Sequence, residues 1–409
     1  MNSRCKRRCC AHPAKLINEN EVSLMSEEHS GLTRRALLSA TAAASLASAQ
    51  SNVAKSTKAN SAVSVALIGC GGRGRNLMRD LVSNTDARLS AVCDLRPERM
   101  ELARAEAIER GETPAMNPSM ASVLASDVDG VIIATPVYMH ADHLEAVVKS
   151  GKHVYIEKPA MPDVAGCKRM MTIADSADRK INLSIGFQRR YGQVYHKAKD
   201  LLDSGAIGKI NLVHLHFIKS SNYNAQPQVP EPQTAEEKMR GWHVWSDLAG
   251  DLIVENNVHL IDVMNWFVGG HPESAIGAGG RARRVIGDMR DHGTVSYLYE
   301  NGVQGTLTGA TLAPSFHRDV YARYFGDTGI IETASGYWKH YRGRNDVFEE
   351  KSPRNVTTDA LEAFVKRIAN DEPENTIVRG AESTLTAILG RMAMEARREV
   401  TWDEMMQSA

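Results

Sequence analysis

The stretch VSVALIGCGGRG, residues 63–74, decides the fold of the first half of this chain. A short apolar run rich in β-branched residues leads directly into a glycine turn, and residues 73–83 then have the pattern of a helix. Gly69, Gly71 and Gly74 form the pattern GxGxxG at this junction. A strand, a glycine turn and a helix in this order are typical of the phosphate-binding turn of a dinucleotide fold.

Each glycine of this turn has a physical function. Gly69 permits the tight turn, Gly71 lets the backbone approach a pyrophosphate, and Gly74 lets the helix pack closely on the strand. A helix N-terminus offers unpaired N–H groups to phosphate oxygens. Gly72 and Arg73 lie in that first turn and join the predicted cofactor-binding residues.

Asp94 ends the next apolar run, RLSAVCD at 88–94, 20 residues after Gly74. A carboxylate in this place accepts hydrogen bonds from the adenosine ribose and repels a 2′-phosphate. NAD is therefore the predicted cofactor. Arg96 and Arg99 follow closely and weaken this preference, so NADP stays the less favoured alternative.

Strand and helix patterns continue to alternate after this unit. They comprise helix 97–111, strand 128–136, helix 140–151 and strand 151–159. Regular alternation of this kind predicts an α/β fold, a doubly wound parallel sheet of the Rossmann type with helices on both faces.

The pattern changes beyond about residue 186. Strand patterns occur at 210–217 and 323–333, and a hairpin at 294–309 has Asn301–Gly302 as its turn. Helical patterns lie near 252–267, 357–370 and 380–398. We therefore predict a C-terminal α+β domain with a large, mostly antiparallel sheet.

The chain has 409 residues, more than a single core usually accommodates. We predict a leader with signal peptide at 1–49, a linker at 50–61, the Rossmann domain at 62–185 and a substrate and oligomerisation domain at 186–409. Lys plus Arg and Asp plus Glu both number 49, so charge alone would recruit neither nucleic acid nor an anionic membrane. A small molecule is the predicted partner, and no membrane span is expected.

Residues 33–49, TRRALLSATAAASLASA, have the layout of a cleavable export signal. Arg34 and Arg35 precede a short apolar run, and the small residues Ala47 and Ala49 stand at its end. The pattern predicts export by the twin-arginine route, to the periplasm or outside the cell. An ordinary N-terminal helix with a chance arginine pair is the alternative.

Two further features of the leader bear on its interpretation. Met25 gives a more compact signal, which suggests that residues 1–24 precede the true start. Cys5, Cys9 and Cys10 lack the ligand spacing of a closed zinc site, so no metal site is predicted. The cysteines of the chain also do not form the pattern of a disulfide framework.

From about Val63 to near the C-terminus, the chain resembles the glucose-fructose oxidoreductase and inositol dehydrogenase family, Gfo/Idh/MocA. Six segments carry the resemblance, and their combination is much more specific than any one of them. They are GCGGRG, ATPVYMH (134–140), GKHVYIEKP (151–159), GFQRRY (186–191), SGAIGKI (204–210) and ENNVHLIDVMNW (255–266).

The resemblance implies a catalytic lysine at the nicotinamide, in the triplet Glu157-Lys158-Pro159. Glu157 and Pro159 would shape the cofactor site. An ammonium beside a substrate hydroxyl can donate a hydrogen bond and stabilise alkoxide character as the hydride leaves. Without the family context, a solvated lysine at a strand end is the simpler interpretation.

Glu255 and His259 are four residues apart on a predicted helix, and Asp262 follows three residues later on the same stripe. The resemblance implies that His259 is the general acid/base and Glu255 its orienting or substrate-binding partner. Asp262, on the same stripe, is a predicted substrate contact. Many relatives carry Asp where this chain has Glu255, which puts the detailed substrate geometry in doubt. A surface pair is the simpler alternative.

Other candidates surround these residues. Thr135, Pro136 and His140 follow a buried strand and are expected to line the nicotinamide ribose. Gln188 is assigned to the cofactor. The predicted substrate contacts are Arg189, Trp242, His243 and Trp245, whose flat rings suit sugars, although tryptophans also fill cores.

These features predict a hydride transfer between a nicotinamide cofactor and a secondary alcohol of a sugar, cyclitol or related polyol. One alternative is an NAD-dependent glycoside hydrolase that oxidises a sugar carbon, eliminates the aglycone and recovers the hydride on a bound cofactor. A non-catalytic carbohydrate-binding protein is the other. The resemblance also implies a homodimer or homotetramer formed through the open sheet.

Overall fold

The computed structural model describes residues 62–221 and 231–409. The predicted leader, its twin-arginine pair, its cysteines and the linker lie outside these ranges. Among the described residues, Cys70, Cys93 and Cys167 are buried and free. No helix in the described ranges is both long enough and apolar enough to span a membrane.

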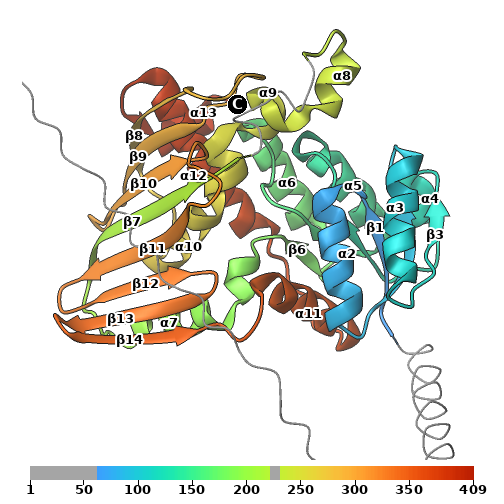
Figure 1. Ribbon diagram of the computed structural model, residues 1–409, viewed down its shortest axis with the longest axis horizontal. Helices are drawn as coiled ribbons and strands as arrows, with labels where there is room; N and C mark the ends of the chain where they lie inside the picture. The colour runs from blue at the N-terminus through green and yellow to red at the C-terminus, as the bar shows by residue number, and fades with distance from the viewer. Residues whose placement is uncertain (1–61, 222–230) are drawn as a thin grey trace, which may run out of the picture. The chain divides into compact units, whose positions relative to one another are not determined.

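Sheet A has six strands in the order β3-β2-β1-β4-β5-β6, and every neighbouring pair is parallel. Its strands are β1 (Ser64–Ile68), β2 (Arg88–Cys93), β3 (Ala115–Asn117), β4 (Gly130–Ile133), β5 (His153–Ile156) and β6 (Leu183–Ile185). The helices that connect them are α2 (Gly72–Asn84), α3 (Pro97–Ile108), α4 (Met120–Leu124), α5 (His140–Ser150) and α6 (Val164–Ser176), as Figure 1 shows. The predicted doubly wound sheet is confirmed. Strand order reverses between β1 and β4, where such sheets bind ligands.

Sheet B has nine strands in the order β14-β13-β12-β11-β7-β10-β9-β8-β15. They are β7 (Ile210–Lys219), β8 (Ser274–Gly280), β9 (His292–Leu298), β10 (Gln304–Ala310), β11 (Arg318–Gly326), β12 (Ile330–Ala334), β13 (Tyr337–Gly343), β14 (Asp346–Lys351) and β15 (Val400–Thr401). Every pair is antiparallel except β7 with β10, which confirms the mostly antiparallel sheet. Gly302, in the predicted hairpin turn, has a φ of 79°.

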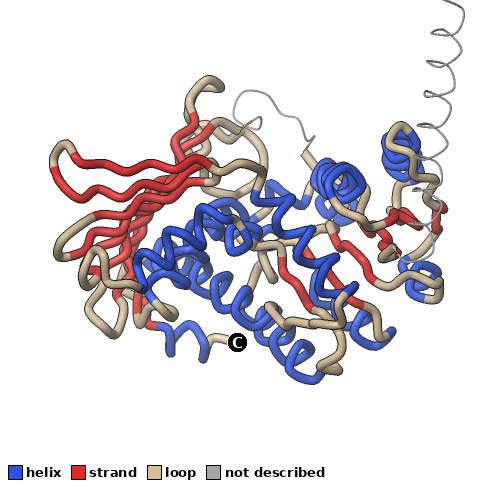
Figure 2. Tube along the Cα trace, turned by 90° about the horizontal axis from the view of Figure 1, so that it is seen from below, coloured by secondary structure: helices blue, strands red, loops and turns tan. Residues whose placement is uncertain are grey.

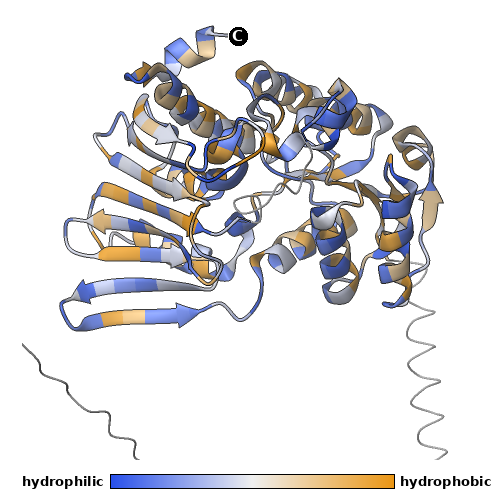
Figure 3. Cartoon of the chain, turned by 45° about the horizontal axis from the view of Figure 1, so that its top comes forward, coloured by the Kyte–Doolittle hydropathy of each residue, from blue (hydrophilic) through white to orange (hydrophobic). Residues whose placement is uncertain are grey.

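Helices cover one face of sheet B (Figure 2). α10 (Val258–Val268) packs on β7 and β11, and α12 (Ile377–Ala396) packs on β8 and β9. Phe267 of α10 stacks on Tyr324 of β11, with ring centroids 4.6 Å apart. The outer hairpin of β13 and β14 is mostly hydrophilic, as expected for strands at a sheet edge (Figure 3).

The helix α11 (Val356–Ala369) returns to sheet A, although its position in the sequence falls in the predicted second domain. It packs on α2. The ring of its Phe364 meets the buried Tyr155 of β5 edge-on at 5.9 Å, and Asp80 of α2 accepts a hydrogen bond from Thr358 at 2.7 Å. A division of the sequence at residue 185 therefore does not separate the two cores.

Candidate active site

The glycine turn after β1 has the geometry that its sequence predicts. Gly69 has a φ of 95°, and a Cβ there would stand 2.6 Å from the backbone of Ala134. A Cβ on Gly74 would collide with the carbonyl oxygen of Gly69. These two glycines are therefore required by a left-handed backbone and by close packing of helix on strand.

The start of α2 is open, which fits the pyrophosphate of a dinucleotide. Gly71 is the N-cap of α2, and no side chain of the described residues caps the helix. A Cβ on Gly72 would meet no described atom within 4 Å, and one on Gly71 would meet only the guanidinium of Arg99, at 3.6 Å. Free N–H groups and open space at a helix start suit phosphate oxygens.

The carboxylate of Asp94 braces this turn. It accepts hydrogen bonds from the backbone N–H of Cys70 at 2.7 Å and of Arg96 at 2.9 Å. A carboxylate has capacity for further acceptor bonds, so the contact with a ribose hydroxyl that the sequence predicts stays open to Asp94.

Arg73 and Glu157 form an ion pair that ties α2 to the end of β5. The Arg73 Nε donates to Glu157 Oε1 at 2.7 Å. Glu157 is almost fully buried, and its Oε2 accepts the backbone N–H of Lys158 at 3.1 Å. The pair thus holds the segment that carries the candidate catalytic lysine.

Lys158 reaches from the Rossmann domain to the second domain. Its Nζ donates to the backbone oxygen of Glu255 at 2.8 Å and lies 3.5 Å from the carboxylate Oε1 of the same residue. Burial alone would raise the pKa of Glu255, but the charges of Lys158 and Lys219 outweigh it and the pKa is lowered. Glu255 is therefore ionised at neutral pH.

His259 lies beside this pair. Its Nδ1 is buried and has no hydrogen-bond partner among the described residues, and its ring meets Phe187 edge-on at 6.4 Å. Burial, followed by the charges of Lys158 and Arg189, holds the pKa of His259 well below its ordinary value. The imidazole is thus neutral at neutral pH and can accept a proton.

The backbone around Glu255 differs from the continuous helix that the sequence predicts. Residues Ile253–Asn257 form a π-helical turn, η5, and α10 begins after it. A π turn changes the angular spacing of side chains, and such turns are frequent at functional sites. Lys158 nonetheless interacts with both residues: its Nζ lies 3.5 Å from the carboxylate of Glu255, and its charge lowers the pKa of His259.

The prediction for Asp262 is wrong. Its side chain is fully buried, and it accepts hydrogen bonds from Arg190 Nε at 2.9 Å and Ser383 Oγ at 2.8 Å. Asp262 therefore holds α10 against the segment of Arg190 and against α12, and it cannot touch a substrate.

The prediction for His140 is also wrong. Its side chain is fully buried, with Nδ1 2.9 Å from the carbonyl oxygen of Pro159 and Nε2 3.2 Å from that of Thr135. His140 thus ties together two loops at the strand ends and does not line the ribose. Thr135, whose Oγ1 lies 2.8 Å from His143 Nδ1, and Pro136 are partly buried just after the end of β4.

The remaining candidates lie on two short 3-10 turns. Gln188 and Arg189 begin the turn η2 (Gln188–Tyr191); Gln188 has a buried Oε1 without a partner in the described ranges, and Arg189 is 5% exposed. Trp242 and His243 lie on η4 (Trp242–Val244), with Trp245 directly after it. Burial lowers the pKa of His243, and the negative charge of Glu255 opposes this shift. Since the charge of Glu255 acts on His243, the turn η4 lies near the candidate catalytic residues.

Two cations beside Glu255 were missed by the sequence analysis. Lys219 is the last residue of β7, and Arg284 lies in the loop 281–291 between β8 and β9. The charges of both residues lower the pKa of Glu255, with smaller contributions than that of Lys158. Neither belongs to a recognisable motif, so only the pairing of the strands brings them here.

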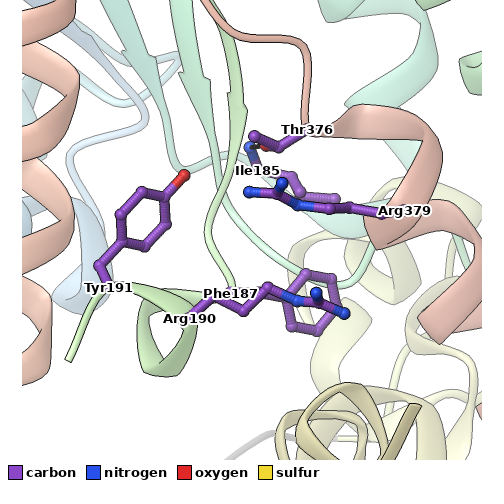
Figure 4. Close-up of a pocket in the computed structure, with 6 residues that line it drawn as sticks. All are labelled: Ile185, Phe187, Arg190, Tyr191, Thr376 and Arg379. Atoms are coloured by element: carbon purple, nitrogen blue, oxygen red, sulfur yellow. Dashed lines mark hydrogen bonds between the residues drawn. The ribbon is translucent and has the colours of Figure 1, made fainter. Parts of the chain in front are cut away.

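A shallow depression lies between β6, η2 and the start of α12 (Figure 4). Its lining residues are Ile185, Phe187, Arg190, Tyr191, Thr376 and Arg379. None of them is a predicted catalytic residue. Phe187 is the lining residue whose ring also meets His259.

Two family models match the chain in succession. Residues 63–187 match an oxidoreductase family with an NAD-binding Rossmann fold, and residues 195–332 match the GFO/IDH/MocA C-terminal domain. The chain belongs to the GFO/IDH/MocA family. As a GFO/IDH/MocA protein, it is an oxidoreductase that uses NAD, and the open glycine turn fits this cofactor.

Characterised members of the GFO/IDH/MocA family resemble the chain over much of its length. Inositol 2-dehydrogenase of Rhizobium meliloti is 26% identical over 65% of this chain and 73% of its own length. Inositol 2-dehydrogenase 3 of Saccharopolyspora erythraea is 32% identical over 50% of this chain and 54% of its own length.

Solved structures share the fold. Levoglucosan dehydrogenase in complex with NADH and levoglucosan has a TM-score of 0.71 and 17% identity, covering 83% of this chain and 99% of that one. Scyllo-inositol dehydrogenase from Lactobacillus casei with bound NAD(H) and scyllo-inositol has a TM-score of 0.65 and 21% identity, covering 84% and 99%.

Proposed function

We propose that the protein oxidises a secondary alcohol of a sugar, cyclitol or related polyol, with NAD as hydride acceptor. One observation carries the proposal: Lys158 of the Rossmann domain donates to Glu255 of the second domain, and the buried Nδ1 of nearby His259 has no hydrogen-bond partner among the residues that the structure describes. Inositol and levoglucosan dehydrogenases among the relatives support this substrate class.

The residues have separate roles in the proposed reaction. The glycine turn at Gly69–Gly74 would hold NAD, which when bound would supply the hydride acceptor for the carbinol carbon. The Lys158 ammonium donates a hydrogen bond to the hydroxyl oxygen that becomes a carbonyl and stabilises its negative charge. His259, neutral at working pH, accepts the hydroxyl proton at a ring nitrogen. Glu255 holds the ammonium in place.

The test measures reduced cofactor with the full chain, NAD⁺ and a panel of neutral polyols that includes myo-inositol, scyllo-inositol, levoglucosan and glucose. Lys158→Met should lower kcat by roughly 10²- to 10⁴-fold, the range for a group that assists proton transfer. Binding of NADH, measured by calorimetry, should not change. Lys149→Met, on a lysine with 73% of its side chain exposed, is the matched control.

Two results would contradict the proposal. One is unchanged turnover in both Lys158→Met and His259→Gln on the best substrate. The other is release of the aglycone from aryl glycosides without net formation of reduced cofactor, which would favour the glycoside hydrolase alternative.

We further propose twin-arginine export and a homodimer or homotetramer. The signal pattern at 33–49 supports the first, and cleavage after Ala49, found by N-terminal sequencing, would test it. Exposed Ile276 and Leu298 on neighbouring strands of sheet B support the second. Native mass spectrometry would report subunit number and bound dinucleotide together.

A further inference from the structure

The chain turns a strained corner just before the π turn η5. Gly250 ends α9 (Ser246–Ala249) with a φ of 85°, and Asp251 follows with a φ of 75°. Two other non-glycine residues in the described ranges, Asp371 and Arg397, have a positive φ, but both follow helix ends, where this conformation is common. Asp251 instead precedes a helical turn, so its backbone conformation needs another explanation.

The side chain of Asp251 holds this corner. It is fully buried, and its Oδ1 accepts the backbone N–H groups of Leu252 and Arg290, both at 2.7 Å. Its Oδ2 accepts a further hydrogen bond from the Arg290 guanidinium. Arg290 lies in the loop that leads into β9, so the carboxylate fixes the start of η5 to sheet B.

The corner also packs on the segment that carries Lys158. A Cβ on Gly250 would stand 3.3 Å from the Cα of Pro162, which is four residues after Lys158 in the chain. The carbonyl oxygen of Pro162 accepts a hydrogen bond from Arg391 of α12 at 2.8 Å. Both partners in the contact between Lys158 and Glu255 are therefore held near this corner.

The position of η5 determines what Lys158 can bind. The Lys158 Nζ donates to the backbone oxygen of Glu255 at 2.8 Å and lies 3.5 Å from its carboxylate. A π turn disturbs the regular ladder of backbone hydrogen bonds, so a side chain can bind a carbonyl oxygen within it. Glu255 comes four residues after Asp251, and both contacts therefore depend on where the turn begins.

We propose that Asp251 is a positioning residue: by accepting the two N–H groups, its carboxylate fixes the start of η5 and so places Glu255 on Lys158. If the corner needed only a left-handed backbone, glycine would serve better than Asp, since glycine adopts that conformation without strain. The effect on turnover rests on the proposed oxidation, whereas the position of Lys158 can be measured without a substrate.

The first test measures how firmly Lys158 is held. Its side chain is 13% exposed, so it should react slowly with acetic anhydride. We expect Asp251→Gly, in the full chain at equal NADH occupancy, to raise the acetylation rate of Lys158 about fivefold or more, as measured by peptide mass spectrometry. Lys152, whose Nζ donates to the carbonyl oxygen of Val128 at 2.8 Å, should react at an unchanged rate and reports any general loosening of the fold.

Two further variants separate the side-chain contacts of Asp251 from its backbone conformation. Asn tolerates a left-handed backbone and keeps an oxygen for both N–H groups, so Asp251→Asn should keep the acetylation rate of Lys158 within about twofold of the original rate. Asp371→Gly is the matched control, because it makes the same substitution at an exposed residue with a φ of 55°. It should change neither lysine's rate.

The second test measures turnover on the best polyol, with kcat expressed per NADH site counted by calorimetry, so that a lower folded fraction does not lower it. Asp251→Gly should reduce this kcat about 10- to 10²-fold, as expected when a catalytic group is misplaced, and leave the affinity for NADH unchanged. Asp251→Asn should restore most of it. Added to Glu255→Ala, Asp251→Gly should cost less than about threefold, because its effect acts through Glu255.

The outcomes distinguish this inference from the proposed oxidation. Acetylation of Lys158 that is unchanged in Asp251→Gly, or that rises together with that of Lys152, would overturn the positioning role. So would an Asp251→Asn chain that behaves like Asp251→Gly, or a full loss of kcat in the Glu255→Ala background. If acetylation follows the expected pattern but no polyol is oxidised by the original chain, the positioning role stands and the proposed oxidation fails.

Discussion

The cofactor side and the substrate side of the candidate site are specified in different ways. The cofactor side is encoded largely within one short stretch, from Gly69 to Asp94, in which Gly74 packs on Gly69 and Asp94 braces the N–H of Cys70. The substrate side collects Lys158, Lys219 and Glu255 from segments that are far apart in the sequence. The local sequence therefore determines the cofactor-binding residues, whereas strand pairing and one π turn determine which residues surround the substrate.

The largest expected effect comes from closing the glycine turn. Gly74→Val should destabilise the fold by about 4 kcal/mol or more and abolish NAD binding, because even a Cβ collides with the Gly69 carbonyl. Urea unfolding and calorimetry with NADH would measure both. Gly336→Ala, where a Cβ meets no described atom within 4 Å, is the control. A stable Gly74→Val chain that binds NADH would show that the turn is less constrained than its geometry indicates.

Lowering the pH should destabilise the fold through His140, which contacts the carbonyl oxygens of Pro159 and Thr135. Burial lowers the pKa of His140 to about 4, whereas the ordinary pKa of the side chain is 6.5. Between these two pH values, the unfolded chain binds a proton at His140 and the folded chain does not. Stability should therefore fall as pH drops from 6.5, by about 3 kcal/mol at pH 4 from His140 alone. Urea unfolding at several pH values would show this. His140→Gln should lose less over the same step, and an equal loss would assign the effect to other groups.

A smaller effect is expected for cofactor choice. Asp94→Ser removes the carboxylate that repels a 2′-phosphate, and it weakens the brace on the Cys70 N–H. We expect the KM for NAD⁺ to rise about tenfold and the discrimination against NADP⁺ to fall by a similar factor. Initial rates with both cofactors would measure it. Unchanged discrimination would mean that Arg96 and Arg99, rather than Asp94, set the choice.

The smallest effect concerns the acid limb of the pH–rate profile, which is the pH range over which kcat/KM falls as the pH is lowered. His259 must be neutral to accept a proton, and four cations keep its pKa low in addition to burial: Lys158, Arg189, Arg73 and Lys219. Removing one of them in Lys219→Met should raise that pKa, so kcat/KM should begin to fall at a higher pH. Profiles measured on a neutral substrate isolate this effect, and Lys149→Met should leave the limb in place. A limb that moved to lower pH would contradict the assignment.

The sequence sufficed where the signal is local. The alternation of patterns predicted sheet A, and the turn at Asn301–Gly302 predicted the hairpin of β9 and β10. The roles of Gly69 and Gly74 also followed from the motif.

The errors have a common cause. Asp262 was placed on the substrate stripe because a helix was assumed to run evenly from Glu255, yet a π turn intervenes and Arg190 takes the carboxylate. His140 follows a strand end as cofactor contacts do, but it is turned inward to two carbonyls. Whether one particular side chain is buried depends on how distant segments pack together, and no local sequence pattern indicates that packing.

The return of α11 to sheet A limits how the chain can be recombined. A fragment that ended near residue 185 would leave Tyr155 without Phe364 and α2 without its covering helix. Grafting a different substrate domain onto this nucleotide-binding half would therefore need three junctions, one before β7 and one on each side of Val356–Ala369. Chimaeras joined at a single point should aggregate, whereas those that keep the native α11 should remain folded.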